Sequence, residues 1–323
     1  MKALRCEALG PAETLVIRDL PEPKPGPGES AIRVRAAALN FFDTLVIQGR
    51  YQVKPPLPFS PSAECAGVVS AVGEGVSDWQ VGERVAAWLG YGAARETVVV
   101  PTQAAIRIPD KLSDHQAAGL FVTYGTALHG LIQRGEIRPG ETLAILGAAG
   151  GAGLAAVEIG ALLGARVIAC ASSPDKLALA REHGAQDGLD YAADDIRAGL
   201  RRLAPNGLDA LYDTVGGELA EPALRSMGWG GRYLVVGFAG GEIPKIPLNL
   251  LLLKGCDLRG VFWGDFVKRD PAGHRANMER LLAWAAAGQI RAHVHGAYPL
   301  EQAAEALALI AERKVQGKVV LVP

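Results

Sequence analysis

The sequence has little charge of one sign, few cysteines and no long run of apolar residues. Its 33 lysines and arginines nearly balance its 34 aspartates and glutamates, for a net charge of −1, which disfavours nucleic acid or an anionic membrane as a partner. The four cysteines lie far apart in the chain, so no zinc knuckle forms between near neighbours and we expect buried, reduced thiols. The first 14 residues hold no apolar segment of the kind that directs secretion. We therefore expect a cytoplasmic protein without a membrane span.

A chain of 323 residues exceeds what one hydrophobic core normally organises, so two domains are expected. Short β-rich runs separated by Pro/Gly turns extend to about residue 118. Beyond it, helices alternate with apolar strands, of which we predict Thr142–Leu146, Arg166–Ala171, Ala210–Tyr212 and Arg232–Val236. Two helices, at about 274–287 and 300–312, and a strand at Gly317–Val322 follow. The sequence predicts an α/β domain with a doubly wound parallel sheet, 119–256, inserted into a mostly β domain of residues 1–118 plus 257–323.

Glycine is abundant, at 40 residues, and one cluster of glycines stands where function is expected. The apolar strand Thr142–Leu146 leads into Gly-Ala-Ala-Gly-Gly-Ala-Gly and then into an uncharged helix. In the G-x-G-x-x-G register the positions are Ala148, Gly150 and Gly153, so alanine replaces the first glycine. Such a turn brings backbone N–H groups and a helix N-terminus against a pyrophosphate. A Rossmann dinucleotide-binding site is therefore predicted; a glycine-rich turn of another α/β fold is the alternative.

The end of the second α/β strand favours NADPH over NADH. An NAD site places an acid there for the ribose 2′-hydroxyl, but this chain has Ala171 and Ser172, followed by Lys176. Small hydroxyls and a cation suit a 2′-phosphate. Asp175 could reach the ribose instead, although it is expected in the first turn of the next helix.

Motifs along nearly the whole chain resemble those of the medium-chain dehydrogenase/reductase superfamily, in its zinc-free NADPH:quinone oxidoreductase, or zeta-crystallin-like, branch. They include Leu39-Asn-Phe-Phe-Asp-Thr44, Pro58-Phe-Ser-Pro-Ser-Ala-Glu-Cys-Ala-Gly67, Gly82-Glu-Arg-Val85, Asp213-Thr-Val-Gly-Gly217 and Gly317-Lys-Val-Val320. The resemblance implies that the β domain is GroES-like and that the α/β domain is a Rossmann domain. Leu45, Ile47 and Ser62 depart from the family's usual residues, which leaves the substrate in question.

The resemblance also assigns roles to individual residues. Asn40 would lie beside the nicotinamide, where it would hold that ring or hydrogen-bond the substrate carbonyl. Tyr51 would donate a proton or form a pocket wall. The residues implied to bind the cofactor are Asn40, Thr126, Ala149, Gly150, Gly151, Ala152, Ser172, Lys176, Tyr191, Gly237, Phe238, Ala239, Phe262, Trp263, Gly264 and Arg313. A structural role is the alternative for five of the residues discussed, namely a solvated helix residue for Lys176, a surface aromatic for Tyr191, a solvated charge for Arg313, packing or dimer contact for Trp263 and a buried carboxylate for Glu64.

No metal site is expected. In the zinc-dependent relatives a cysteine and a histidine ligand align with Asn40 and Ala63, and neither asparagine nor alanine completes a Cys/His zinc site. Hydride would then pass from the nicotinamide to an acceptor that is already electrophilic. We expect an NADPH-dependent quinone oxidoreductase. The alternatives are an NADPH-dependent C=C reductase of enones or enoyl thioesters, and a non-catalytic NADPH-binding protein. The resemblance further implies a homodimer that pairs through an edge strand at about Asp257–Phe262.

Overall fold

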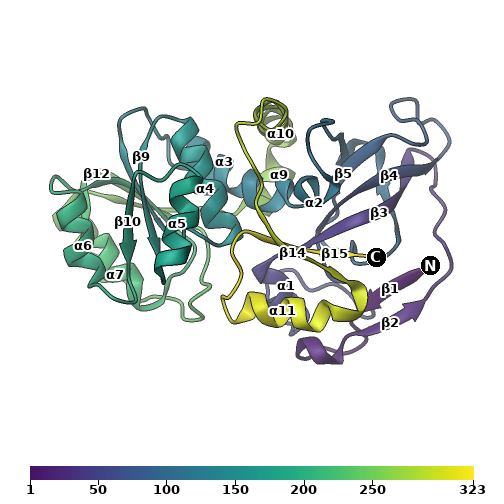
Figure 1. The fold of residues 1–323 in the computed structure, drawn as a ribbon, viewed down its shortest axis with the longest axis horizontal. Coiled ribbons are helices and arrows are strands. Elements are labelled where there is room, and N and C mark those ends of the chain that lie inside the picture. The colour runs from purple at the N-terminus through teal and green to yellow at the C-terminus, as the bar shows by residue number, and fades with distance from the viewer. The chain divides into compact units, whose positions relative to one another are not determined.

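The structure is a computed structural model that describes all residues, 1–323. It divides into two compact units (Figure 1): unit 1 comprises residues 1–122 and 282–323, and unit 2 comprises residues 123–281. Unit 2 is one continuous stretch that separates the two segments of unit 1. The strand at 257–260 belongs to the unit 2 sheet and lies beyond residue 256, where the α/β domain was predicted to end.

Unit 1 is built on a seven-stranded, mainly antiparallel sheet in the order β14-β15-β3-β4-β5-β7, with β6 also paired to β3. Its strands are β3 (Glu29–Leu39), β4 (Glu64–Val72), β5 (Arg84–Trp88), β6 (Thr97–Pro101), β7 (Ala105–Arg107), β14 (Val294–Pro299) and β15 (Lys318–Val322). A separate hairpin pairs β1 (Lys2–Arg5) with β2 (Val16–Asp19). The C-terminal strand β15 lies between β14 and β3, so the two ends of the chain build one sheet.

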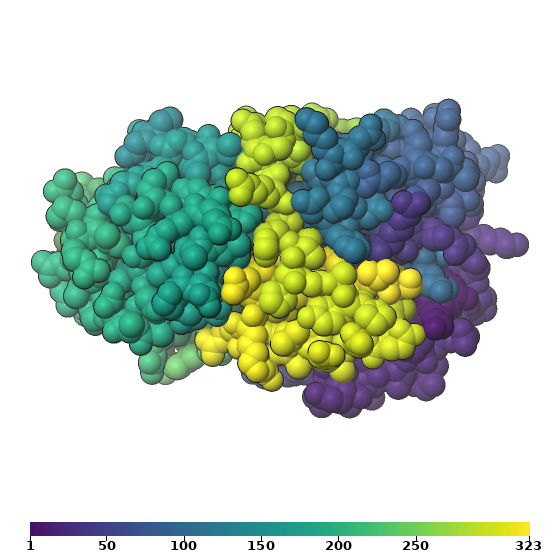
Figure 2. Space-filling view, in the orientation of Figure 1, coloured from purple at the N-terminus to yellow at the C-terminus, as the bar shows by residue number.

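Short helices complete unit 1: α1 (Phe41–Val46), α2 (Asp114–Ala118) and α11 (Ala303–Ala311), with 3₁₀ turns at 12–14, 102–104 and 300–302. Helix α11 forms part of the surface (Figure 2, yellow) and buries Ala303, Ala306 and Leu307 in the unit 1 core. Apolar residues three and four positions apart share one helix face, which explains why this segment covers the sheet.

Unit 2 contains a six-stranded parallel sheet in the order β10-β9-β8-β11-β12-β13. The strands are β8 (Thr142–Leu146), β9 (Arg166–Ala171), β10 (Asp187–Asp190), β11 (Leu208–Asp213), β12 (Met227–Val235) and β13 (Asp257–Gly260). Numbered along the chain this is the order 3-2-1-4-5-6 of the Rossmann fold. Leu143–Leu146 are completely buried, as expected for a strand covered on both faces.

The helices of unit 2 all follow its first strand, β8, except α3, which precedes it. They are α3 (Gly125–His129), α4 (Gly151–Leu162), α5 (Pro174–Glu182), α6 (Ile196–Leu203), α7 (Ala220–Leu224), α8 (Asn249–Lys254), α9 (Trp263–Arg269) and α10 (Pro271–Ala286), the last of which crosses into unit 1; π-helical turns flank α3 at 120–124 and 130–134. The start of α5 shows why the sequence folds this way, since Ser173 accepts the N–H of Lys176 and Pro174 occupies the first turn.

All four cysteines are buried and free, which confirms the expected buried thiols. None of the helices is long and apolar enough to cross a membrane.

Candidate functional site

The carboxyl edge of the unit 2 sheet collects most of the predicted cofactor residues. The glycine turn follows β8, Ser172 follows β9, Tyr191 follows β10, Gly237 follows β12 and Phe262 follows β13. Parallel strands end at one edge, and ligands of open α/β sheets bind outside that edge.

The glycine turn has the geometry of a pyrophosphate cradle. Gly147 has a φ of +74°, so the residue before Ala148 makes the sharp turn, and this explains how alanine is tolerated at the first motif position. A Cβ on Gly153 would lie 2.0 Å from the Gly147 carbonyl oxygen, so only glycine lets α4 approach the strand this closely. Helix α4 starts at Gly151 after Gly150, and the first N–H groups of a helix have no partner within it. A dinucleotide phosphate fits these donors.

Ser172, Lys176 and Tyr191 lie together at the ends of β9 and β10. The Lys176 ammonium donates a hydrogen bond to Ser172 Oγ at 3.0 Å, and the Tyr191 N–H donates to the carbonyl of Ala171 at 3.0 Å. Asp175 lies in the first turn of α5, as expected. The corner presents a cation and a hydroxyl at the end of β9, where an NAD site has a carboxylate, and this suits a ribose 2′-phosphate.

The remaining unit 2 residues lie around the same sheet edge or in α3. The Gly237 N–H donates to Asp213 and that of Ala239 to Thr214, so Gly237–Ala239 is tied to the end of β11. Trp263 is 5% exposed and lies against Gly125, the residue before Thr126. A Cβ added to Gly125 would lie 2.7 Å from the indole Nε1 of Trp263. Its neighbour Phe262 is half exposed. Trp263 therefore has a packing role in unit 2, while the proposed cofactor contact of residues 262–264 stays a prediction.

Asn40 occupies the centre of a buried polar cluster in unit 1. Its Oδ1 accepts a hydrogen bond from the Lys318 ammonium at 2.7 Å, and its Nδ2 donates to Glu64 Oε1 at 3.0 Å. Lys318 also donates to Glu64 Oε1 at 3.0 Å and to the Leu39 carbonyl at 3.1 Å. The side chains of this ion pair are 4% and 0% exposed. Glu64 is thus the buried carboxylate of the structural alternative, and it is bonded directly to Asn40.

Asp43 supports Asn40 from the other side. Its carboxylate accepts the N–H of Asn40 at 2.8 Å and that of Ser62 at 3.0 Å. Burial raises the pKa of Asp43 to about 7, although these two N–H donors favour the ionised form. Ser62 has a φ of +68°, the conformation for which glycine is the usual residue, and its Oγ donates to the carbonyl of Ala38 at 2.9 Å. A backbone bond to Asp43 and side-chain bonding hold this strained serine.

The other two unit 1 residues differ in their surroundings. Tyr51 is half-buried and stacks on Phe42 with ring centroids 5.3 Å apart. Burial raises the pKa of the Tyr51 hydroxyl, so this group holds its proton more tightly than a free tyrosine. Arg313 is exposed after α11, with a φ of +58°. Neither placement decides between the alternatives stated for these residues.

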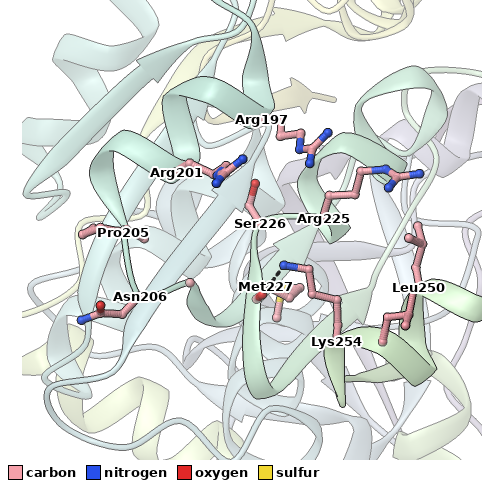
Figure 3. A pocket seen from close by; sticks show the side chains of 12 residues that line it. Arg197, Arg201, Pro205, Asn206, Arg225, Ser226, Met227, Leu250 and Lys254 are labelled. Atoms are coloured by element: carbon pink, nitrogen blue, oxygen red, sulfur yellow. Dashed lines mark hydrogen bonds between the residues drawn. The ribbon is translucent and has the colours of Figure 1, made fainter.

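A separate hollow of about 360 Å³ lies at the opposite edge of the unit 2 sheet (Figure 3). Residues 204–207 and 225–227, which line it, immediately precede or begin β11 and β12. Its cations are Arg197, Arg201, Arg225 and Lys254. Arg225 pairs with Glu221 and Lys254 donates to the Met227 carbonyl, whereas Arg197 and Arg201 form no ion pair. None of the predicted cofactor residues lines this hollow.

Sequence reasoning missed Lys318. It lies within the motif Gly317-Lys-Val-Val320, and the available signal was a lysine at the start of an otherwise apolar strand. A second buried cluster in unit 2 was also missed: Glu158 accepts from the Tyr124 hydroxyl at 2.7 Å and lies 2.6 Å from His183 Nδ1. This cluster links α4 to α5 and to the turn before α3. No group of three or more His, Cys, Asp or Glu residues is placed to hold a metal ion.

Comparisons with known proteins agree with this architecture. Residues 26–110 match the alcohol dehydrogenase GroES-like domain family and residues 151–287 match the family described as zinc-binding dehydrogenase. The chain is 38% identical to quinone oxidoreductase-like protein 2 of Rattus norvegicus, over 93% of this chain and 86% of that protein. It is 34% identical to quinone oxidoreductase of Pseudomonas aeruginosa, over 100% and 99% of the two chains.

Solved structures extend the similarity to both units. Quinone oxidoreductase of Escherichia coli complexed with NADPH has a TM-score of 0.91 at 27% identity, covering 100% of both chains. The mycobacterial protein Rv1454c complexed with NADPH has a TM-score of 0.92 at 31% identity, again over 100% of both chains. Fold, glycine turn and relatives agree, and the chain belongs to the medium-chain dehydrogenase/reductase superfamily, among its quinone oxidoreductase-like members.

Proposed function

We propose that this oxidoreductase uses NADPH to reduce quinones. The observation that carries the cofactor choice is the Lys176 ammonium, 3.0 Å from Ser172 Oγ at the end of β9. A cation and a hydroxyl at this point complement a 2′-phosphate, whereas an NAD site has an acid there. Two relatives of the same fold are described as complexes with NADPH, and several relatives are named quinone oxidoreductases, which supports a quinone as the acceptor.

In this proposal the protein binds and orients while the cofactor supplies the hydride. The N-terminus of α4 would bind the pyrophosphate, and Lys176, Ser172 and Tyr191 would surround the 2′-phosphate. Asn40, Thr126 and the segments Gly237–Ala239 and Phe262–Gly264 would hold the nicotinamide end. The quinone would gain a hydride from NADPH and a proton from solvent or Tyr51, which balances the reaction to NADP⁺ and hydroquinone.

Zinc independence rests on the ligand positions. In zinc-dependent relatives a cysteine and a histidine align with Asn40 and Ala63, and here Asn40 Oδ1 is hydrogen-bonded to an ammonium group. A lysine cation so close to the position disfavours a second cation at the same place. An acceptor that is already electrophilic, such as a quinone, does not need a Lewis acid.

A second copy of the chain is the partner we propose for unit 2. Strand β13 is an edge strand, and Trp229, Leu248, Leu252 and Leu253 are between 72% and 86% exposed. Monomeric proteins rarely leave such groups of large apolar side chains in water, and an open edge strand is able to pair with its own copy. The four buried free cysteines fit the reducing cytoplasm that we propose as its location.

The test is the loss of reduced-nicotinamide absorbance after chelator treatment, with NADPH and either 1,4-benzoquinone or a matched enone. We expect fast oxidation with the quinone. Oxidation only with the enone would replace the proposal by the C=C reductase, and tight NADPH binding without turnover on any acceptor would favour the non-catalytic alternative. Activity that disappears with the chelator and returns with zinc would contradict the zinc-free assignment.

A further inference from the structure

The side-chain amide of Asn40 is held between two opposite charges. Its oxygen is 2.7 Å from the Lys318 ammonium and its nitrogen is 3.0 Å from Glu64 Oε1. The second oxygen of Glu64 accepts the backbone N–H of Val122 at 2.9 Å, so the carboxylate is itself anchored. The third bond of Lys318 goes to the Leu39 carbonyl.

These two charges fix the orientation of the Asn40 side-chain amide. An ammonium group only donates hydrogen bonds and a carboxylate only accepts them. If the Asn40 amide turned over, its N–H₂ would face the Lys318 ammonium and its oxygen would face Glu64, so both bonds would become repulsive contacts. Because the pair is almost completely buried, water does not screen that repulsion.

The hydrogen-bond inventory of Asn40 then leaves one group for a ligand. The oxygen is engaged by Lys318, and one of the two N–H bonds is engaged by Glu64. The second N–H has no partner within the chain, and Asn40 retains 7% of its exposure. We infer that Lys318 and Glu64 are positioning residues that lock Asn40 as a hydrogen-bond donor, so that the site receives a carbonyl oxygen at this point. This inference rests on the proposed function, and the carbonyl belongs either to the quinone or to the nicotinamide carboxamide.

Stability alone does not account for the ion pair. A buried pair of this kind is often replaceable by apolar side chains of similar size without loss of stability, and Lys318 begins a strand that continues Val-Val-Leu-Val. Apolar residues would fill the same space, but they would leave the Asn40 amide free to turn over. Orientation of Asn40 is what the charges add.

The test uses a double variant that removes both charges, Lys318→Met with Glu64→Gln, because Lys318→Met alone leaves a buried carboxylate without its cation and risks unfolding. The matched control is Lys314→Met with Glu312→Gln, which removes a solvent-exposed Lys–Glu pair of the same C-terminal segment. Lys318→Arg is the conservative variant. All are compared for thermal unfolding, NADPH dissociation constant, and kcat and KM for 1,4-benzoquinone.

A structural readout accompanies the kinetics. In the ¹⁵N spectrum the side-chain signal of Asn40 is assigned by its loss in Asn40→Leu. The native protein is expected to show two well-separated Nδ2 proton resonances, because one proton is bonded to a buried carboxylate. In the double variant the two resonances move together, while the control pair leaves them unchanged.

We expect the double variant to fold and to lose about tenfold or more in kcat/KM for the quinone. The conservative variant Lys318→Arg is expected to retain most of the wild-type kcat/KM. An accompanying rise in the NADPH dissociation constant assigns the carbonyl to the nicotinamide carboxamide; an unchanged constant assigns it to the quinone. Native amide resonances and quinone kinetics within twofold of wild type in the double variant would overturn the inference. If the native protein fails to reduce quinones, the proposed function fails, and the amide resonances still decide whether Asn40 is locked.

Discussion

Replacing Lys176 by glutamine is the sharpest test of cofactor choice. The ammonium lies beside Ser172 Oγ at the end of β9 and is half-buried. A hydrogen bond to a charged group contributes about 1.5–3 kcal/mol, and partial exposure places Lys176 toward the lower part of that range. A loss of about 2 kcal/mol corresponds to about 30-fold weaker binding. NADH has no 2′-phosphate, so its affinity should change by less than twofold.

The assay measures KM and dissociation constants for NADPH and NADH with the same acceptor, in Lys176→Gln and in Lys254→Gln. Lys254 is the matched control because its ammonium donates to the Met227 carbonyl at the opposite edge of the same sheet. Raising the ionic strength should shrink the difference between NADPH and NADH, as expected for a charge interaction. A parallel loss of affinity for both cofactors, or an unchanged NADPH affinity, would refute the assignment of Lys176 to the 2′-phosphate.

Three further predictions concern stability and assembly. Burial raises the pKa of Asp43 from 3.8 to about 7. Between these values the folded state keeps a proton that the unfolded chain releases. The free energy of unfolding should therefore fall by up to about 4 kcal/mol between pH 4 and pH 7. In urea titrations Asp43→Asn should lack this decrease; equal pH profiles would show that Asp43 is not its source. Leu252→Glu should convert a dimer to a monomer in size-exclusion chromatography at micromolar concentration. The control Val81→Glu, at an exposed position of unit 1, should leave the dimer intact. A monomeric native protein would refute the β13 interface. Arg197→Glu should raise the free energy of unfolding by about 0.5 kcal/mol, because it removes repulsion from Arg201 and places an acid in the first turn of α6. A loss of stability in thermal unfolding would show that Arg197 and Arg201 do not repel each other at a cost to stability.

The parts of the fold that local pattern determines were predictable. Strands β8 and β9 have the predicted bounds, because each is a short apolar run between turn residues. The end of the Rossmann sheet was not predictable, because the segment Asp257–Gly260 is short and polar. Only its pairing with β12 places it in that sheet. Likewise β1, β2 and β14 were not predicted, and each is defined by its pairing: β1 with β2, and β14 with β15.

The candidate site divides in the same way. The glycine turn and the Ser172–Lys176 corner are local in sequence, so spacing and residue type were enough to predict them. The surroundings of Asn40 were not predictable, because Lys318 lies 278 positions away and reaches Asn40 only through the pairing of β15 with β3. The φ of Gly147 shows that the sharp turn is made one residue before the first motif position. Nothing in the residue types of the motif indicates this.

The placement of β15 has a consequence for how the protein matures. The strand enters the unit 1 sheet between β14 and β3, yet it is synthesised after the whole of unit 2. A nascent chain is therefore able to fold its Rossmann unit while the first 122 residues still lack this strand and the cation beside Asn40. Residues 37–39 of β3, which β15 covers in the finished sheet, are the part of that intermediate that needs protection from other chains.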